Sequence, residues 1–185
     1  MSAILPFPRG KTFSQNADST KFTLSDQNFK SLEGKTFEVT DTVHGTGEKI
    51  KLRVVKNDSG AAITVAADRL VMFSVTSDTD FGNRVSGYNT VAGGVCKPID
   101  DDYAVGFSIP DDDLFYIIEE GLCDIEAENT GISAGNAVAS NNTAQVNNAV
   151  AAAGEYVVGT AQEASAASTA LLVRVAPGFA LPDAA

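Results

Sequence analysis

Two acidic runs are the part of this 185-residue sequence best suited to chemistry. Residues 100–102 and 111–113 are each three consecutive aspartates. Such carboxylates could bind a cation, or act as an acid–base pair if an apolar pocket raised the pKa of one of them. Consecutive aspartates point in different directions, however, and the EF-hand spacing of acidic residues and glycine is absent. We interpret both runs as solvated loop charge, with a weak structural cation as the alternative, and assign no catalytic residue, metal ligand or cofactor.

His44 is the single histidine of the chain, so a Ser-His-Asp or Cys-His site would have to use it. It precedes Gly45 in a predicted turn. The Gly-x-Ser-x-Gly match at residues 131–135 falls in a predicted turn between strands, not in the strand-to-helix turn of a nucleophile elbow. The glycines between Gly82 and Gly94 match neither phosphate-binding loop pattern. We interpret His44 as a turn residue and expect that the protein is not an enzyme.

The two cysteines, Cys96 and Cys123, are too few for a disulfide framework and lack the Cys-x-x-Cys spacing of redox and metal sites. Free cysteine is often buried and packs as a small hydrophobic residue. We expect two buried, reduced thiols, with a single disulfide between them as the alternative.

The charge of the chain is unevenly placed. Residues 1–56 contain nine Lys and Arg against six Asp and Glu, whereas the remainder contains four against eighteen, which gives the net charge of −11. Phosphate binding needs clustered basic residues, so we expect no nucleic acid partner. No stretch reaches the roughly 18–20 apolar residues of a membrane span, and the N-terminus lacks the features of a secretory signal, so we expect no membrane partner. A basic N-terminal part on an acidic body suits contacts between copies of the chain, or with an acidic neighbour.

Residues 1–34 show no sustained helical or strand periodicity. Two prolines favour an extended start, and isolated aromatic residues follow in polar sequence that cannot bury itself. We interpret this stretch as an extended arm that binds a partner, with a disordered tail or a strand added to the body as alternatives. The candidate partner-binding residues are Pro6, Phe7, Pro8, Arg9, Phe13, Phe22 and Phe29.

From residue 35 onward, alternating apolar and β-branched residues separated by turn residues predict an all-β fold. The polar, glycine-rich residues 78–94 are the best candidate for a domain boundary. We predict an extended arm over 1–34, followed by two small β-barrel-like or sandwich-like regions over 35–92 and 93–185. The predicted strands are 36–43, 50–54, 63–66, 70–75, 95–97, 103–108, 114–119, 123–128, 136–139, 143–146, 156–161 and 170–175, with a single helical turn at 148–153.

One short pattern occurs twice in the second region. Residues 103–106, Tyr-Ala-Val-Gly, are echoed by residues 156–159, Tyr-Val-Val-Gly, and each copy precedes a loop and an apolar strand. We therefore expect two similar hairpins, with each glycine ending or bulging its strand.

Three stretches of the C-terminal half resemble one known family. Residues 132–138, Ile-Ser-Ala-Gly-Asn-Ala-Val, are similar to a glycine turn and strand of the tailed-bacteriophage head decoration (cement) proteins. Residues 155–164 are similar to that family's small-residue stretch before the last apolar strand, and residues 103–107 resemble an earlier copy of it. Asn136 replaces an acidic residue usual in the family, and residues 1–94 show no such likeness. The resemblance implies a virion location, contact with the major capsid protein, and a homotrimer around a local three-fold axis.

We therefore predict a decoration protein that binds the outer surface of the capsid and stabilises it by bridging neighbouring subunits. The predicted partners are the major capsid protein and copies of the chain itself. One alternative is another virion structural protein, such as a head fibre or a tail component. A carbohydrate-binding or adhesin domain is a second alternative. It would need an exposed aromatic platform, and a chain with no tryptophan and four tyrosines is poorly equipped for one.

Overall fold

The computed structural model describes residues 5–14, 32–74, 82–90, 95–128, 131–141, 143–149, 156–166 and 168–176. The described residues form twelve strands and no helix, which confirms the all-β prediction. None of these ranges contains a helix that could cross a membrane. The strands are β1 (Thr36–Thr40), β2 (Lys49–Asn57), β3 (Ile63–Thr64), β4 (Leu70–Phe73), β5 (Arg84–Tyr88), β6 (Cys96–Pro98), β7 (Ser108–Ile109), β8 (Leu114–Ala127), β9 (Ala137–Ser140), β10 (Val146–Asn148), β11 (Val157–Ala161) and β12 (Thr169–Val175).

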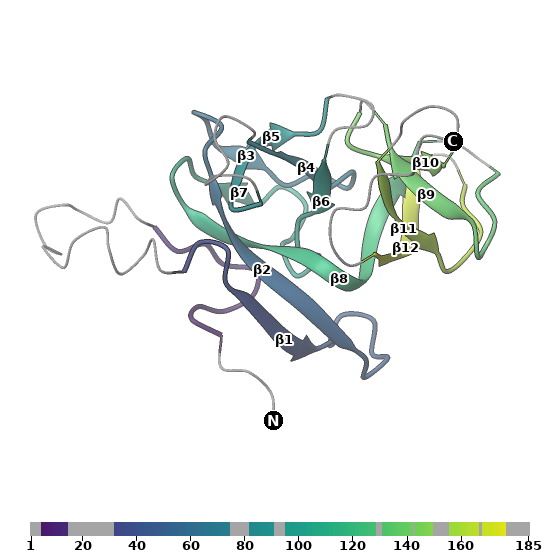
Figure 1. Ribbon diagram of the computed structural model, residues 1–185, viewed down its shortest axis with the longest axis horizontal. Helices are drawn as coiled ribbons and strands as arrows, with labels where there is room; N and C mark the ends of the chain where they lie inside the picture. The colour runs from purple at the N-terminus through teal and green to yellow at the C-terminus, as the bar shows by residue number, and fades with distance from the viewer. Residues whose placement is uncertain are drawn as a thin grey trace, which may run out of the picture.

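Strand β8 is the longest element, with 14 residues, and it runs through both halves of the molecule (Figure 1). Its first half pairs antiparallel with β2, and its second half pairs antiparallel with β12. The prediction of two separate strands at 114–119 and 123–128 was therefore wrong. The acidic residues and Gly121 that break the apolar pattern lie within one continuous strand, whose partner changes at that point.

The C-terminal half is a closed five-stranded barrel. Its strands follow the order β8-β12-β11-β9-β10, and the parallel pairing of Val146 in β10 with Ala127 in β8 closes the circle. Closure leaves no unpaired edge along the ring and points alternate side chains inward. Ile125, Val158 and Leu171 are accordingly fully buried.

The N-terminal half is a sheet that curls back onto the same strand. From β8 the order continues through β2, β5, β4 and β6, and β1 pairs with the outer part of β2. A bridge between Ile99 and Ile117 returns the chain from the end of β6 to β8. Pairing of β4 with β6 crosses the predicted boundary between residues 92 and 93, so backbone hydrogen bonds join the two predicted β regions.

The predicted loop over 78–94 was wrong in part, because β5 lies inside it. Val85 of this strand is fully buried. Gly87 and the neighbouring polar residues interrupt the apolar alternation by which a strand is recognised in a sequence. The left-handed backbone of Gly87, with a φ of 129°, lies where the pairing with β4 shifts register. A strand that contains such an irregularity does not show a clean alternation.

The predicted pair of similar hairpins is not present. Residues 103–106 form turns rather than a strand, and Tyr103 is a fully buried side chain. In the second copy, Gly159 lies at a bulge of β11, as expected.

Two other predictions concern the residues before β11. Strand β10 starts at Val146 rather than at 143. Most of the predicted helical turn at 148–153 lies outside the described residues.

The core is one cluster of buried apolar side chains that extends through both halves. Cys96 and Cys123 belong to it as free, fully buried thiols, which confirms the prediction for the cysteines. Burial raises the pKa of Cys96 to about 12 and also raises the pKa of Cys123. Both thiols therefore stay protonated and pack as apolar groups.

Gly121 allows β8 to change partners, and we predict that Gly121→Ala destabilises the fold. Its φ is +117°, and a Cβ there would lie 2.7 Å from Cγ2 of Ile50 and 3.0 Å from its Cα. The combined strain and clash should cost about 2–4 kcal/mol in urea unfolding. Gly106→Ala is the matched control, because Gly106 also has a positive φ of 89° but open space around it. Equal losses in the two variants would contradict a role for the Ile50 contact.

Candidate functional site

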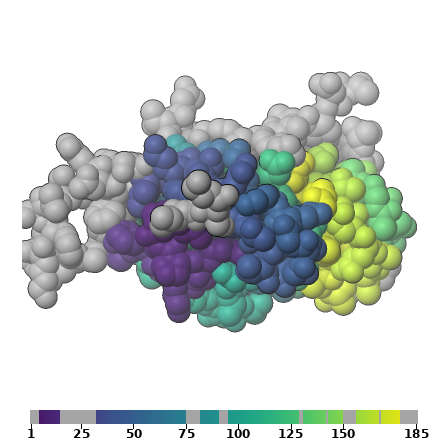
Figure 2. Space-filling view, turned by 90° about the horizontal axis from the view of Figure 1, so that it is seen from below, coloured from purple at the N-terminus to yellow at the C-terminus, as the bar shows by residue number. Residues whose placement is uncertain are grey.

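The described part of the predicted arm, residues 5–14, lies against the body of the protein. Figure 2 shows this segment (purple) packed beside the strands coloured blue. Phe7 is buried, Phe13 and Arg9 are half-buried, and Pro6 and Pro8 are exposed on either side of Phe7. The docking site for this segment is the candidate functional site, and we call residues 5–14 the docked segment.

Phe7 is the aromatic anchor of the docked segment. Its ring stacks on Tyr116 of β8, with ring centroids 4.3 Å apart and planes 19° from parallel. The Tyr116 hydroxyl donates a hydrogen bond to the Phe7 carbonyl at 2.9 Å. Burying a phenylalanine side chain stabilises by about 1.5–3 kcal/mol, and a good aromatic pair adds to this. An aromatic ring and a backbone carbonyl are thus recognised by one tyrosine.

Two further backbone contacts fix the direction of the segment. Phe13 and Leu114 form an isolated antiparallel bridge, in which each N–H donates to the other carbonyl at 2.9 Å. The Tyr103 hydroxyl donates to the Lys11 carbonyl at 2.7 Å and accepts the backbone N–H of Tyr116 at 3.2 Å. The alternative of a strand added to the body therefore describes part of the segment.

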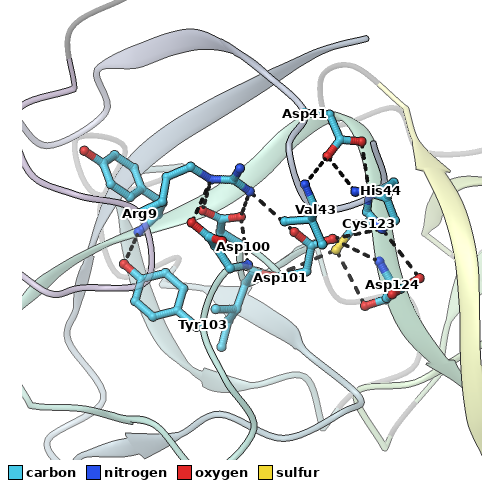
Figure 3. Close-up of polar contacts among 12 residues, drawn as sticks. Arg9, Asp41, Val43, His44, Asp100, Asp101, Tyr103, Cys123 and Asp124 are labelled. Atoms are coloured by element: carbon cyan, nitrogen blue, oxygen red, sulfur yellow. Dashed lines mark hydrogen bonds and ion pairs between the residues drawn. The ribbon is translucent and has the colours of Figure 1, made fainter. Parts of the chain in front are cut away.

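Arg9 clamps the segment to the first acidic run (Figure 3). Its Nε donates to Oδ2 of Asp100 at 2.9 Å, and its Nη2 donates to Oδ1 of the same carboxylate. Asp101 and Asp102 lie 3.5 and 3.6 Å away. Burial opposes the charge of Arg9, but the hydrogen bond and charge of Asp100 outweigh it, and the pKa of Arg9 is raised. Bidentate geometry of this kind makes the ion pair strong and directional.

The interpretation of the acidic runs as solvated loop charge was wrong for several of their members. Asp100 is fully buried, the Asp101 side chain is 3% exposed, and Asp113 is 4% exposed. Asp102 and Asp112 are the more exposed members, at 37% and 40% of their side chains. The sequence could not show that a basic segment distant in the chain covers the first run.

His44 lies at the other end of the same cluster. Its Nδ1 is 3.0 Å from Asp41 Oδ2, and its Nε2 is 3.3 Å from Asp101 Oδ2 and 3.7 Å from Asp124 Oδ1. A neutral imidazole has one N–H and can donate to only one side, whereas the imidazolium can donate to both. His44 is therefore more than a turn residue, because it links the loop after β1 to the Asp101 turn and β8.

Asp101 is the carboxylate at the centre of the cluster. Burial and the negative charge of Asp100 raise its pKa to about 6, although His44 and Arg9 act in the opposite direction. Asp41 differs, because hydrogen bonds from His44 and Val43 outweigh the effect of burial and lower its pKa. Of these two carboxylates, Asp101 is therefore the one that takes up a proton first as the pH falls.

The arrangement holds a polypeptide segment of the same chain. Cys123, the nearest thiol, has a raised pKa, and its Sγ faces the carbonyl of Ile99 at 3.9 Å. Within the described ranges, no group of three or more His, Cys, Asp or Glu side chains is placed to hold a metal ion. A cavity of about 280 Å³ lies elsewhere, at the seam between the two halves, and is lined by Lys49, Glu120, Gly121, Thr160, Arg174, Val175 and Ala176.

Five of the seven predicted partner-binding residues lie in the docked segment, and Phe22 and Phe29 lie outside the described residues. Phe7, Arg9 and Phe13 are brought together on the body, and their binding to another protein stays a prediction. The sequence analysis missed Tyr103 and Tyr116 as the side chains that receive the segment. No local signal marks them, since their role depends on residues about 100 positions earlier in the chain.

Comparisons with known proteins give a distant likeness to a solved structure. No model of a known protein family matches the chain, and no curated protein sequence matches it significantly. Among solved structures, the chain is similar to the N base of the head fibre protein gp8.5 of bacteriophage phi29. The identity is 12% and the TM-score 0.42, over 71% of this chain and 98% of that one.

Removing the clamp should weaken the docked segment. Arg9→Ala would leave the buried Asp100 carboxylate without its main partner, so we expect a loss of about 2–4 kcal/mol in urea unfolding. Amide hydrogen exchange of residues 7–13 should also become faster. Lys11→Ala is the control, because Lys11 is exposed and should change stability by less than about 0.5 kcal/mol. Similar stability of the two variants would exclude the clamp as a stabilising contact.

The stability of the fold should depend on pH through Asp101. Its folded-state pKa, about 6, lies above its ordinary value of 3.8, so the folded state binds this proton more tightly. The stability this provides is complete below about pH 4 and is lost as the pH rises through 6. Asp101→Asn should therefore stabilise the protein at pH 7 by up to about 3 kcal/mol and flatten its profile between pH 4 and 6.

Urea unfolding at pH 4, 5, 6 and 7 measures this effect. Asp102→Asn is the control, because that side chain is 37% exposed. A pH profile of Asp101→Asn that parallels the wild type would show that the proton is bound elsewhere.

Proposed function

We propose that this protein is a structural protein of a bacteriophage virion that acts by binding other protein subunits, with no bond made or broken. The observation that carries the proposal is the docking site for residues 5–14. Its aromatic stack, backbone bridge and bidentate ion pair are the means by which proteins recognise extended polypeptides. The best-built polar site among the described residues is thus a site for a peptide segment.

More narrowly, we propose that the protein decorates the outer surface of a capsid and stabilises it. The sequence resemblance to head decoration proteins supports this role. Two of the stretches that carry it are residues 132–138, which reach the first two residues of β9, and residues 155–164, which contain β11; these strands are neighbours in the closed barrel. The proposed partners are the major capsid protein and further copies of this chain. Area buried in such contacts stabilises a shell by about 25 cal/mol per Å², and repetition adds avidity.

The test is binding to shells assembled from the major capsid protein alone. We expect saturable occupancy at symmetry-related positions on the outer surface, visible by electron cryomicroscopy, and a higher temperature of shell disruption at saturation. The control is the same protein with its surface amines blocked by acetylation and its fold verified by circular dichroism.

Three other outcomes separate the proposal from its rivals. Occupancy restricted to a few sites with a projecting density would assign the protein to a head fibre. Binding to tails and not to shells would assign it to the tail. Failure to bind any virion part, with binding to a glycan array instead, would exclude a virion role.

A further inference from the structure

We propose that the docking site also accepts residues 5–14 of a second copy of this chain, so that neighbouring subunits exchange their docked segments. The inference rests on the proposed function, because decoration of a capsid would place many copies of the chain close together. It names the partner of the site, because the segment and the surface that receives it belong to the same sequence.

The docked segment and its site are complementary in charge and shape. Residues 5–14 include Arg9 and Lys11 and no acidic residue, so the segment carries a charge of +2. The site presents the three aspartates 100–102, of which Asp100 is fully buried beneath Arg9. Stacking of Phe7 on Tyr116 adds an apolar anchor. A second copy is therefore the one partner certain to carry a segment of the right chemistry.

The contacts of the segment can form equally well between two chains. They consist of one stacked ring, one bidentate ion pair, one bridge and hydrogen bonds to two tyrosines. Exchange replaces each contact by an identical one, so the contact free energy is unchanged, and the local concentration of neighbouring chains decides which form prevails. A surface lattice of subunits supplies a high local concentration.

A repeated tetrapeptide identifies residues 10–13 as a strand-adding unit. Gly-Lys-Thr-Phe occurs at 10–13 and again at 34–37, and both glycines have a positive φ, 67° and 76°. The second copy leads into β1, which pairs with β2 at five positions. The first copy makes a single bridge, at Leu114 of β8. The two copies thus lie on opposite sides of the β2–β8 pair, and the first is the more weakly held.

The chain is long enough for the exchange. Residues 15–31 connect the docked segment to the body, and 17 residues can span at most about 60 Å. A compact domain of this size is about 40 Å across, by the usual scaling of the radius of gyration. An adjacent copy is therefore within reach of the segment.

Zero-length cross-linking of wild-type protein tests the proposal. Gly10 packs against the carbonyl of Asp102, so the backbone of the next residue, Lys11, lies next to the aspartate run, and its exposed side chain carries the one amine of the docked segment. A carbodiimide joins an amine to a carboxylate, and an equal mixture of ¹⁵N-labelled and unlabelled protein shows which chains were joined. We expect mixed-label peptides that link Lys11 to residues 100–102. They should be at least ten-fold more abundant at millimolar than at micromolar concentration, and abundant on saturated shells.

The controls separate exchange from accidental contact and from the proposed function. Lys11→Ala should abolish the cross-link, whereas Arg9→Ala should reduce it at every concentration. Same-label peptides alone, both in millimolar solution and on shells, would overturn the exchange and leave decoration intact. Mixed-label peptides in solution from a protein that binds no shell would support exchange and contradict decoration.

Discussion

The structure depends on one strand that serves two sheets. The first half of β8 pairs with β2, and its second half pairs with β12. Each half of the molecule also ends in a bridge to β8, through Ile99 in the N-terminal half and Val146 in the C-terminal half. A strand can do this only if its backbone bends and twists where the partner changes, which requires a local irregularity. The register shift opposite Lys51 and Leu52 and the left-handed Gly121 supply it. One apolar core can then extend through both halves, because no boundary of unpaired backbone separates them.

The same strand also connects the fold to the candidate site. Leu114 and Tyr116 receive the docked segment, while Cys123 and Asp124 lie beside the Asp101 turn and His44. The segment therefore does not rest on a separate surface patch. It covers side chains of the strand that organises the core, and the acidic turn that receives Arg9 lies directly after the Ile99 bridge.

Electrostatics explains why the cluster can hold a basic segment and still respond to pH. Five carboxylates of the cluster, Asp41, Asp100, Asp101, Asp102 and Asp124, face one arginine and one histidine. The arginine satisfies Asp100, which leaves the buried Asp101 as the group that gains most from a proton. The cluster thus binds the basic segment through Asp100 and keeps a protonatable carboxyl in Asp101.

The sequence by itself determined what depends on local pattern. Alternating apolar residues placed most strands and the all-β class, and the buried state of Cys96 and Cys123 followed from their type and number. The prolines around Phe7 and the basic charge of the first residues predicted an arm that binds a partner, and its binding to another protein stays a prediction. These features depend on residue types that are close together in the sequence, so they can be predicted without knowledge of the tertiary structure.

Only the tertiary structure decided what depends on distant pairing. The continuity of β8 across Gly121, the strand β5 within a polar stretch and the turn at Tyr103 all result from partners that lie far away in the sequence. The burial of Asp100 and Asp101 has the same origin, since Arg9 stands more than 90 positions before them. Burial and ionisation depend on what the rest of the chain places around a group, and local sequence does not contain that information.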